Sequence, residues 1–258
     1  YKKQGRGGTG SNSTSLLEDD YVSQLFIGST HDHILFITNA GKAYWVKVHE
    51  IPEASKASRG THIKSMIAIG ADEEITTVVT LKEFSDEQYL FMTTMNGVVK
   101  KVKTSEFSNA KTRGIIGLKL NAGDKLISAI PTDGNSEVLL VSRRGKALRF
   151  TEEDVRSMGR ASCGIKGLKL AEGDEVAGAI KVIPDESILL LTEKGYGKRV
   201  HFEDFKPHGR GTGGQRIFGN IEERGEIIGL LTVKDKDEII AMTSQGKTLR
   251  VTADTINH

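Results

Sequence analysis

Cysteine is nearly absent from this 258-residue sequence, in which Cys163 is the only one. A single thiol excludes an internal disulfide, a zinc cluster held by several thiolates and a paired-cysteine redox motif, and it fits a reducing compartment. No apolar run reaches the roughly 18 to 20 residues of a membrane span, and no apolar stretch follows the basic N-terminus as a signal peptide requires. We therefore expect a cytoplasmic protein without membrane contact.

Proline and aromatic residues are also scarce, with four prolines and 6% aromatics, whereas glycine is abundant with 29 residues. Short runs of valine and isoleucine between the glycines favour strands joined by tight turns over helices. The apolar content of 37% is enough to bury a core. These proportions predict an all-β fold.

A hairpin pattern recurs five times, with about 50 residues between copies. Each copy has an apolar run, a glycine and a second strand-forming run with basic residues. The copies are "ILFITNAGKAYWVKV", "YLFMTTMNGVVKKVK", "VLLVSRRGKALRF", "ILLLTEKGYGKRVHF" and "IIAMTSQGKTLRV", with turn glycines Gly41, Gly97, Gly145, Gly195 and Gly246. An apolar run, a turn that tolerates positive φ and a second β-rich run predict a β-hairpin.

A second segment recurs between the hairpins and contains a basic glycine-bearing loop, a short strand and an acidic turn, as in "AKTRGIIGLKLNAGDK" and "GRASCGIKGLKLAEGDE". The repeats start near residues 4, 57, 111, 160 and 208, within one domain that spans residues 1–258. Each repeat is expected to form one four-stranded blade, and radial packing of the blades gives a propeller-like disc. The sequence holds five whole units and, at "RVTADTINH", the edge of another.

The net charge of +2 conceals a strong segregation of charge. The five basic loops carry +14 over 61 residues, so the remainder carries −12. A strand of about six residues holds a loop and its acidic turn roughly 20 Å apart, beyond a Debye length of about 8 Å. Repeated around a disc, the loops form a positive belt, which is typical of a protein that binds a nucleic-acid backbone.

The loops supply the candidate binding residues. Glycine lets phosphates approach backbone N–H groups, and the absence of aromatic residues from the loops disfavours base stacking and single-stranded ligands. We therefore expect double-stranded DNA as the ligand, with little base readout. The candidate rim residues are Lys2, Lys3, Lys56, Arg59, Lys64, Lys111, Arg113, Lys119, Arg156, Arg160, Lys166, Lys169, Arg210 and Arg216.

Other interpretations of these loops remain open. Single lysines and arginines in loops are often only solvated, and a protein-interaction propeller would explain the same glycine period. The stretches "GRGGTG" and "GRGTGG" fit the dinucleotide fingerprint, but neither opens a helix after a βαβ strand. We expect no metal site, no cofactor and no catalytic residue in this domain.

The stretch "QGRGGTG" resembles the GyrA box, the motif at the start of the C-terminal domain of the DNA gyrase A subunit. Segments such as "FMTTMNGVVKKVKTSEF" and "KGYGKRVHFEDF" are similar to that domain in the same order. The box is formed by Gln4, Gly5, Arg6, Gly7, Gly8, Thr9 and Gly10. The family usually has basic residues at the second and sixth positions, where this chain has Gly5 and Thr9.

This resemblance implies a β-pinwheel, usually of six blades, that wraps a DNA duplex around its basic rim. In the family, the wrapped duplex is passed as the transport segment, and ATP hydrolysis yields negative supercoils. The implied partners are double-stranded DNA, the N-terminal part of the gyrase A polypeptide and the gyrase B polypeptide in an A2B2 enzyme of the bacterial nucleoid. The catalytic tyrosine, the ATPase site, ATP and magnesium belong to other parts of that enzyme. The related domain of topoisomerase IV, which wraps DNA less, is the alternative that the incomplete box keeps open.

Overall fold

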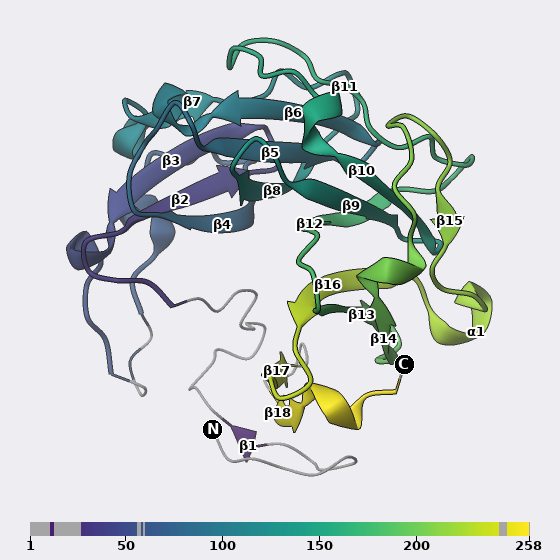
Figure 1. Ribbon diagram of the computed structural model, residues 1–258. Helices are drawn as coiled ribbons and strands as arrows, with labels where there is room; N and C mark the ends of the chain where they lie inside the picture. The colour runs from purple at the N-terminus through teal and green to yellow at the C-terminus, as the bar shows by residue number, and fades with distance from the viewer. Residues whose placement is uncertain (1–10, 13–26, 56–57, 59, 243–246, 258) are drawn as a thin grey trace.

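The computed structural model describes residues 11–12, 27–55, 58, 60–242 and 247–257. Figure 1 shows antiparallel sheets that follow one another around an arc, like the blades of a propeller. Three of the described sheets have four strands and two have three. The all-β, propeller-like arrangement of blades confirms that part of the predicted fold class, and the number of blades stays a prediction. None of the helices among these residues is long or apolar enough to cross a lipid bilayer.

Five hairpins form the centres of the blades, and we number blades 1 to 5 in their order along the chain. The hairpins are β2–β3 (His33–Thr38 and Lys42–Lys47), β5–β6 (Tyr89–Thr94 and Val98–Lys103), β9–β10 (Glu137–Ser142 and Lys146–Thr151), β13–β14 (Ser187–Thr192 and Gly197–His201) and β17–β18 (Glu238–Met242 and Lys247–Thr252). Each coincides with one of the five sequence copies, so the hairpin prediction is confirmed.

Two further strands flank the hairpins. On the inner side of blades 1 to 4 lie β4 (Ile75–Leu81), β8 (Leu126–Thr132), β12 (Val176–Lys181) and β16 (Ile227–Val233). The short outer strands of blades 1, 2, 3 and 5 are β7 (Ile115–Ile116), β11 (Ile165–Lys166), β15 (Gln215–Arg216) and β1 (Ser11–Asn12). In Figure 1 the inner strands line the inside of the arc, and β7, β11 and β15 follow its outside.

The prediction that one repeat forms one blade is wrong. The inner strand of a blade comes from the repeat after its hairpin, and the outer strand comes from the loop one repeat further along. In blade 1, for example, β2 pairs with β4 and β3 pairs with β7. Because every blade takes strands from successive repeats, each repeat holds its neighbours together.

Short helical turns follow the hairpins and punctuate the loops. After the hairpins come η1 (Val48–Glu50), η3 (Thr104–Phe107), η5 (Glu152–Asp154), η6 (Phe202–Asp204) and η7 (Ala253–Thr255). In the loops lie η2 (Ile63–Ser65), η4 (Lys111–Arg113) and the α-helical turn α1 (Ile221–Arg224). These turns reverse the chain between hairpin and loop.

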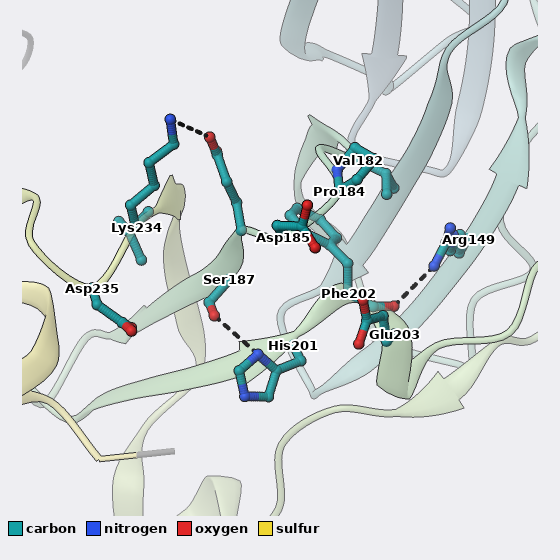
Figure 2. A pocket seen from close by; sticks show the side chains of 12 residues that line it. Arg149, Val182, Pro184, Asp185, Ser187, His201, Phe202, Glu203, Lys234 and Asp235 are labelled. Carbon is teal, nitrogen blue, oxygen red and sulfur yellow. Dashed lines mark hydrogen bonds and ion pairs between the residues drawn. The ribbon is translucent and has the colours of Figure 1, made fainter.

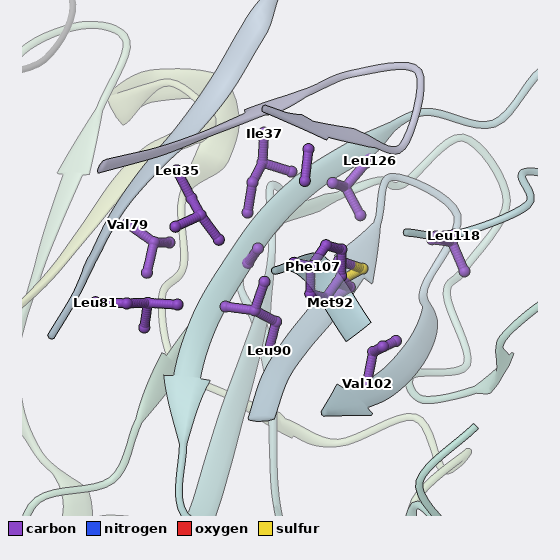
Figure 3. Close-up of a cluster of buried hydrophobic side chains, with 12 residues drawn as sticks. Leu35, Ile37, Val79, Leu81, Leu90, Met92, Val102, Phe107, Leu118 and Leu126 are labelled. Carbon is purple, nitrogen blue, oxygen red and sulfur yellow. The ribbon is translucent and has the colours of Figure 1, made fainter. Parts of the chain in front are cut away.

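The hydrophobic core lies between the blades. In β2, Leu35 and Ile37 belong to a cluster shared with blade 2, whereas Ile34 and Phe36 belong to a cluster on the opposite face. Figure 3 shows the first cluster, where Leu90 and Met92 of β5 meet the side chains of β2. Because the central strands are covered on both faces, their sequences are apolar without alternation.

A repeated polar contact supplements this apolar packing. The fourth residue after each described turn glycine donates a hydrogen bond to a carbonyl in or beside the helical turn of the next blade. The bonds are Trp45 Nε1 to Phe107 O (3.1 Å), Lys101 Nζ to Glu152 O (3.0 Å), Arg149 Nη1 to Phe202 O (3.0 Å) and Arg199 Nε to Ile256 O (2.7 Å). The basic residues of the hairpins therefore join blades.

The four turn glycines among the described residues have positive φ as predicted, with Gly145 at +85° and Gly195 at +82°, and Gly246 lies outside the described residues. At Gly145 a Cβ atom would lie 2.4 Å from the carbonyl oxygen of Phe218, in the loop docked on that turn. At Gly195 a Cβ atom would meet nothing within 4 Å. The two positions thus share a backbone conformation and differ in whether another segment touches it.

We expect Gly195→Ala to destabilise the fold by about 1–2 kcal/mol through backbone strain alone. Gly145→Ala should cost about 1–3 kcal/mol more, because the docked loop must move away. Urea unfolding followed by circular dichroism measures both values. Equal losses for the two variants would contradict close docking of the loop at Phe218.

Candidate nucleic-acid interface

The structure describes most of the predicted rim residues. Lys2, Lys3, the box from Gln4 to Gly10, Lys56 and Arg59 lie outside the described residues. The remaining candidates come from four loop segments, 60–68, 111–119, 156–169 and 206–219, which we call the basic rim.

Neighbouring segments of the basic rim are joined by backbone hydrogen bonds. Ala68 N donates to Thr112 O at 2.8 Å, Lys119 N to Ser162 O at 3.2 Å, and Lys169 N to Thr212 O at 2.9 Å. These three bonds occupy the same place in successive repeats. The segments consequently lie side by side in sequence order, and their spacing is set by the backbone.

Most cations of the basic rim point into solvent. The predicted candidates that are exposed, and whose side chains form no hydrogen bond or ion pair within the described part of the chain, are Lys64, Lys111, Arg113, Lys119, Arg156, Lys166, Lys169 and Arg216. A row of cations without carboxylate partners leaves its charge available to an external polyanion. This arrangement suits phosphates better than a neutral ligand.

Arg160 and Arg210 are held differently from the other candidates. Arg160 Nε lies 3.3 Å from a carboxylate oxygen of Glu106. Arg210 Nε donates to Asp154 O and its Nη1 to Lys166 O, each at 3.0 Å. Each guanidinium therefore anchors its loop to the blade beneath it, so contact with phosphate would have to coexist with this role.

Sequence reasoning missed two lysines at the rim. Lys146 is exposed on β10, directly opposite Arg216 of β15 in the strand register, and it extends the row of cations. Lys100 of β6 is fully buried beneath two of the loops. The sequence showed that the second strand of each hairpin is basic. It did not show which of those basic residues face the loops.

The acidic turns have structural roles beyond balancing charge. Asp124 and Asp174 are buried, and each caps the neighbouring hairpin turn, with Oδ1 accepting from Asn96 N at 3.0 Å and from Arg144 N at 3.1 Å, respectively. Glu73 accepts from Lys42 Nζ at 2.8 Å and Tyr44 OH at 3.0 Å. Burial opposes ionisation of Glu73, but these hydrogen bonds prevail and hold its pKa below the usual value.

A cavity of about 360 Å³ opens between blades 3 and 4 and the segment that leads from β16 to β17. Figure 2 shows Ser187 beside His201, with Ser187 Oγ 3.2 Å from His201 Nδ1. A Glu186 carboxylate oxygen lies 3.4 Å from Lys234 Nζ. Four carboxylates line the cavity, from Asp185, Glu186, Glu203 and Asp235. This surplus of negative charge does not suit a phosphate.

A propeller-like all-β domain with interlocked basic loops on its outer edge is the class that this fold and surface define. The chain belongs to the family described as the DNA gyrase C-terminal domain, a β-propeller. The family model matches residues 1–29, 32–82, 88–133, 136–183, 186–234 and 237–257.

Named relatives agree with this assignment. The DNA gyrase A subunit of Treponema pallidum is 61% identical over 251 residues, which are 97% of this chain and 31% of the relative. The corresponding protein of Mycolicibacterium smegmatis is 38% identical over 98% of this chain and 30% of its own length. The chain thus spans about a third of these relatives.

Two solved structures are similar in shape. A DNA gyrase A C-terminal domain matches with a TM-score of 0.85 and 30% identity, covering 100% of this chain and 85% of that one. The C-terminal domain of a DNA topoisomerase IV matches with a TM-score of 0.77 and 29% identity, covering 87% of this chain and 71% of that one.

Proposed function

We propose that this domain binds double-stranded DNA by its phosphates and bends it along the basic rim. The observation that carries the proposal is the chain of backbone hydrogen bonds that aligns exposed, unpaired cations across consecutive blades. Phosphate contacts of this kind position a duplex without reading its sequence. Lys119, Lys166 and Lys169 are central, because they lie beside two of the bonds that join loops.

We also propose that the complete ring has six positions. In blades 1 to 3 the outer strand comes from the loop of a later repeat, the second one after the repeat that contains the hairpin. In blade 5 it comes from the first loop, because β1 pairs with β18. By the same step, the hairpin of the fifth repeat would take its outer strand from a seventh position. The first loop can fill that position only if the ring closes after six positions.

Membership in the gyrase family supports a further role. In the whole enzyme, the bent duplex would be wrapped on the rim and presented as the transport segment for ATP-dependent negative supercoiling. ATP and magnesium would act in other parts of this bacterial type IIA topoisomerase. The partners would be the N-terminal part of the gyrase A polypeptide and the gyrase B polypeptide, in the cytoplasm with the nucleoid.

A salt titration with a duplex of about 100 base pairs tests the binding proposal. Because binding by phosphate contacts releases counterions, affinity should fall by about 10³ or more between 50 and 200 mM salt. Fluorescence anisotropy or electrophoretic mobility measures the change. Absent or salt-insensitive binding would favour a protein-interaction propeller instead.

The second candidate is a topoisomerase IV domain, favoured by the close structural match and by Gly5 and Thr9 in the box. Relaxation of circular DNA in the presence of the domain separates the two. A change in linking number supports chiral wrapping of the gyrase kind. Binding without such a change supports the topoisomerase IV kind.

A further inference from the structure

Lys100 is a buried lysine at the junction of two basic loops. Its side chain is fully buried on β6, and its ammonium donates to three backbone carbonyls. These are Gly117 O at 2.9 Å, Arg160 O at 2.6 Å and Ser162 O at 2.9 Å. Three N–H groups meet three acceptors, so the ammonium is fully hydrogen-bonded.

The three carbonyls belong to two different loops. Gly117 follows β7 in the outer edge of blade 1, whereas Arg160 and Ser162 precede β11 in the outer edge of blade 2. Ser162 O also accepts the backbone hydrogen bond from Lys119. The ammonium and that backbone bond therefore converge on one carbonyl at the point where the two loops meet.

We propose that Lys100 is a positioning residue of the basic rim, which fixes the loop bearing Lys119 against the loop bearing Lys166 so that both reach one duplex. The proposal rests on the DNA-binding function proposed above. Lys100 itself is fully buried and does not touch the ligand. It acts by keeping two sets of exposed cations at a constant spacing, so that binding does not have to order the loops.

The next residue provides an internal comparison. Lys101 is also buried, but its side chain faces the opposite side of β6, where Nζ donates to Glu152 O at 3.0 Å and lies 5.1 Å from the ring centre of Tyr89. The Lys101 side chain thus joins blades without a hydrogen bond to the rim loops, and the backbone bond from Met158 N to Lys101 O (2.9 Å) does not depend on that side chain. Substituting either lysine removes a buried cation, and only one substitution releases the loops.

The charge state of Lys100 provides a second test. Burial lowers the pKa of Lys100 to about 8, with the nearby Arg160 acting in the same direction and Cys163 and Glu106 opposing it. Loss of a proton removes one of the three donors and leaves a carbonyl without its partner. The hydrogen bonds by which Lys100 joins the two loops should therefore weaken as the pH rises above 8.

The first test compares Lys100→Met with Lys101→Met in the 258-residue chain, after circular dichroism establishes that each is folded. For Lys100→Met we expect affinity for a duplex of about 100 base pairs to fall about tenfold. The salt slope, which is the slope of log affinity against log salt concentration, should become shallower by an amount equivalent to one or two phosphate contacts. For Lys101→Met both should change less than twofold. A loss of folded protein alone would lower the active fraction but leave the salt slope unchanged.

Amide hydrogen exchange without DNA provides an independent readout. Exchange at the Lys119 amide should accelerate about tenfold or more in Lys100→Met and stay unchanged in Lys101→Met, because opening of the loop contact exposes that amide. Equal behaviour of the two variants in exchange and in binding would overturn the proposal. Faster exchange in a protein that binds no duplex, even unmodified, would support the joining of the two loops by Lys100 and reject the DNA-binding function.

A pH series on a Cys163→Ser background, which removes the exposed thiol, completes the test. Affinity of the otherwise unmodified protein should fall between pH 7 and 9, and that of Lys100→Met should stay flat. The free energy of unfolding should change in the opposite direction to the affinity. Between pH 8 and 10.5 the unfolded state, in which the lysine pKa is 10.5, binds more protons than the native state. The contribution of Lys100 to the free energy of unfolding therefore rises with pH in this range. Parallel losses of affinity in both proteins would contradict the proposal.

Discussion

Simultaneous substitution of Lys119, Lys166 and Lys169 by glutamine should weaken duplex binding about a hundredfold at physiological salt and lower the salt slope by about three. These lysines are exposed and form no ion pair within the described residues, so their removal should leave the fold intact. They lie on two neighbouring loops that a backbone hydrogen bond joins. Affinity measured across a range of salt concentrations gives both quantities.

A charge-matched control comes from Lys82, Lys125 and Lys236, which are exposed but lie away from the basic rim. Replacing these three by glutamine changes the net charge equally, and we expect the affinity to change less than about threefold, because distant charges are screened. If both triple variants lost affinity to the same extent, net charge rather than the aligned rim would govern binding.

The sequence predicted the features that are encoded locally. Hairpins could be located because each pairs residues on either side of one glycine, and the positive φ of Gly41 or Gly97 follows from the geometry of such a turn. Exposed loop cations could likewise be predicted, because polar glycine-rich loops lie at the surface.

The exchange of strands between repeats could not be predicted from the sequence. A two-residue strand such as Ile165–Lys166 has no periodicity, and its partner, β6, lies more than 60 residues earlier. The burial of both Lys100 and Lys101 was equally hidden, since alternation along a strand predicts that one of two adjacent residues faces solvent. Both are buried because the rim loops at Gly117 and Ser162 cover one face of β6, and η5 of the next blade covers the other.

Glu152 is a buried carboxylate whose loss should strongly destabilise the fold. Its side chain is fully buried at the start of η5. The carboxylate accepts from Gly134 N and Ser136 N, each at 2.8 Å, and from Thr132 Oγ1 at 2.7 Å. Lys101 Nζ of blade 2 lies 3.9 Å from the same carboxylate. One side chain therefore joins blade 2, the turn that leads into blade 3, and η5.

Glu152→Ala should lower the free energy of unfolding by about 3–5 kcal/mol, because it leaves buried donors unpaired and the Lys101 ammonium without its counter-charge. Glu153→Ala, on the same turn but exposed, should stay within about 0.5 kcal/mol. Urea unfolding followed by circular dichroism gives both values. A loss for Glu152→Ala close to that of Glu153→Ala would show that the network contributes little.

The shape of the unfolding transition carries further information. In repeat architectures stability is approximately a sum of repeat and nearest-neighbour terms, so weakening one junction can uncouple the units on either side. We therefore expect Glu152→Ala to broaden the transition and lower its m-value, whereas Gly195→Ala, which strains one turn, should shift the midpoint alone.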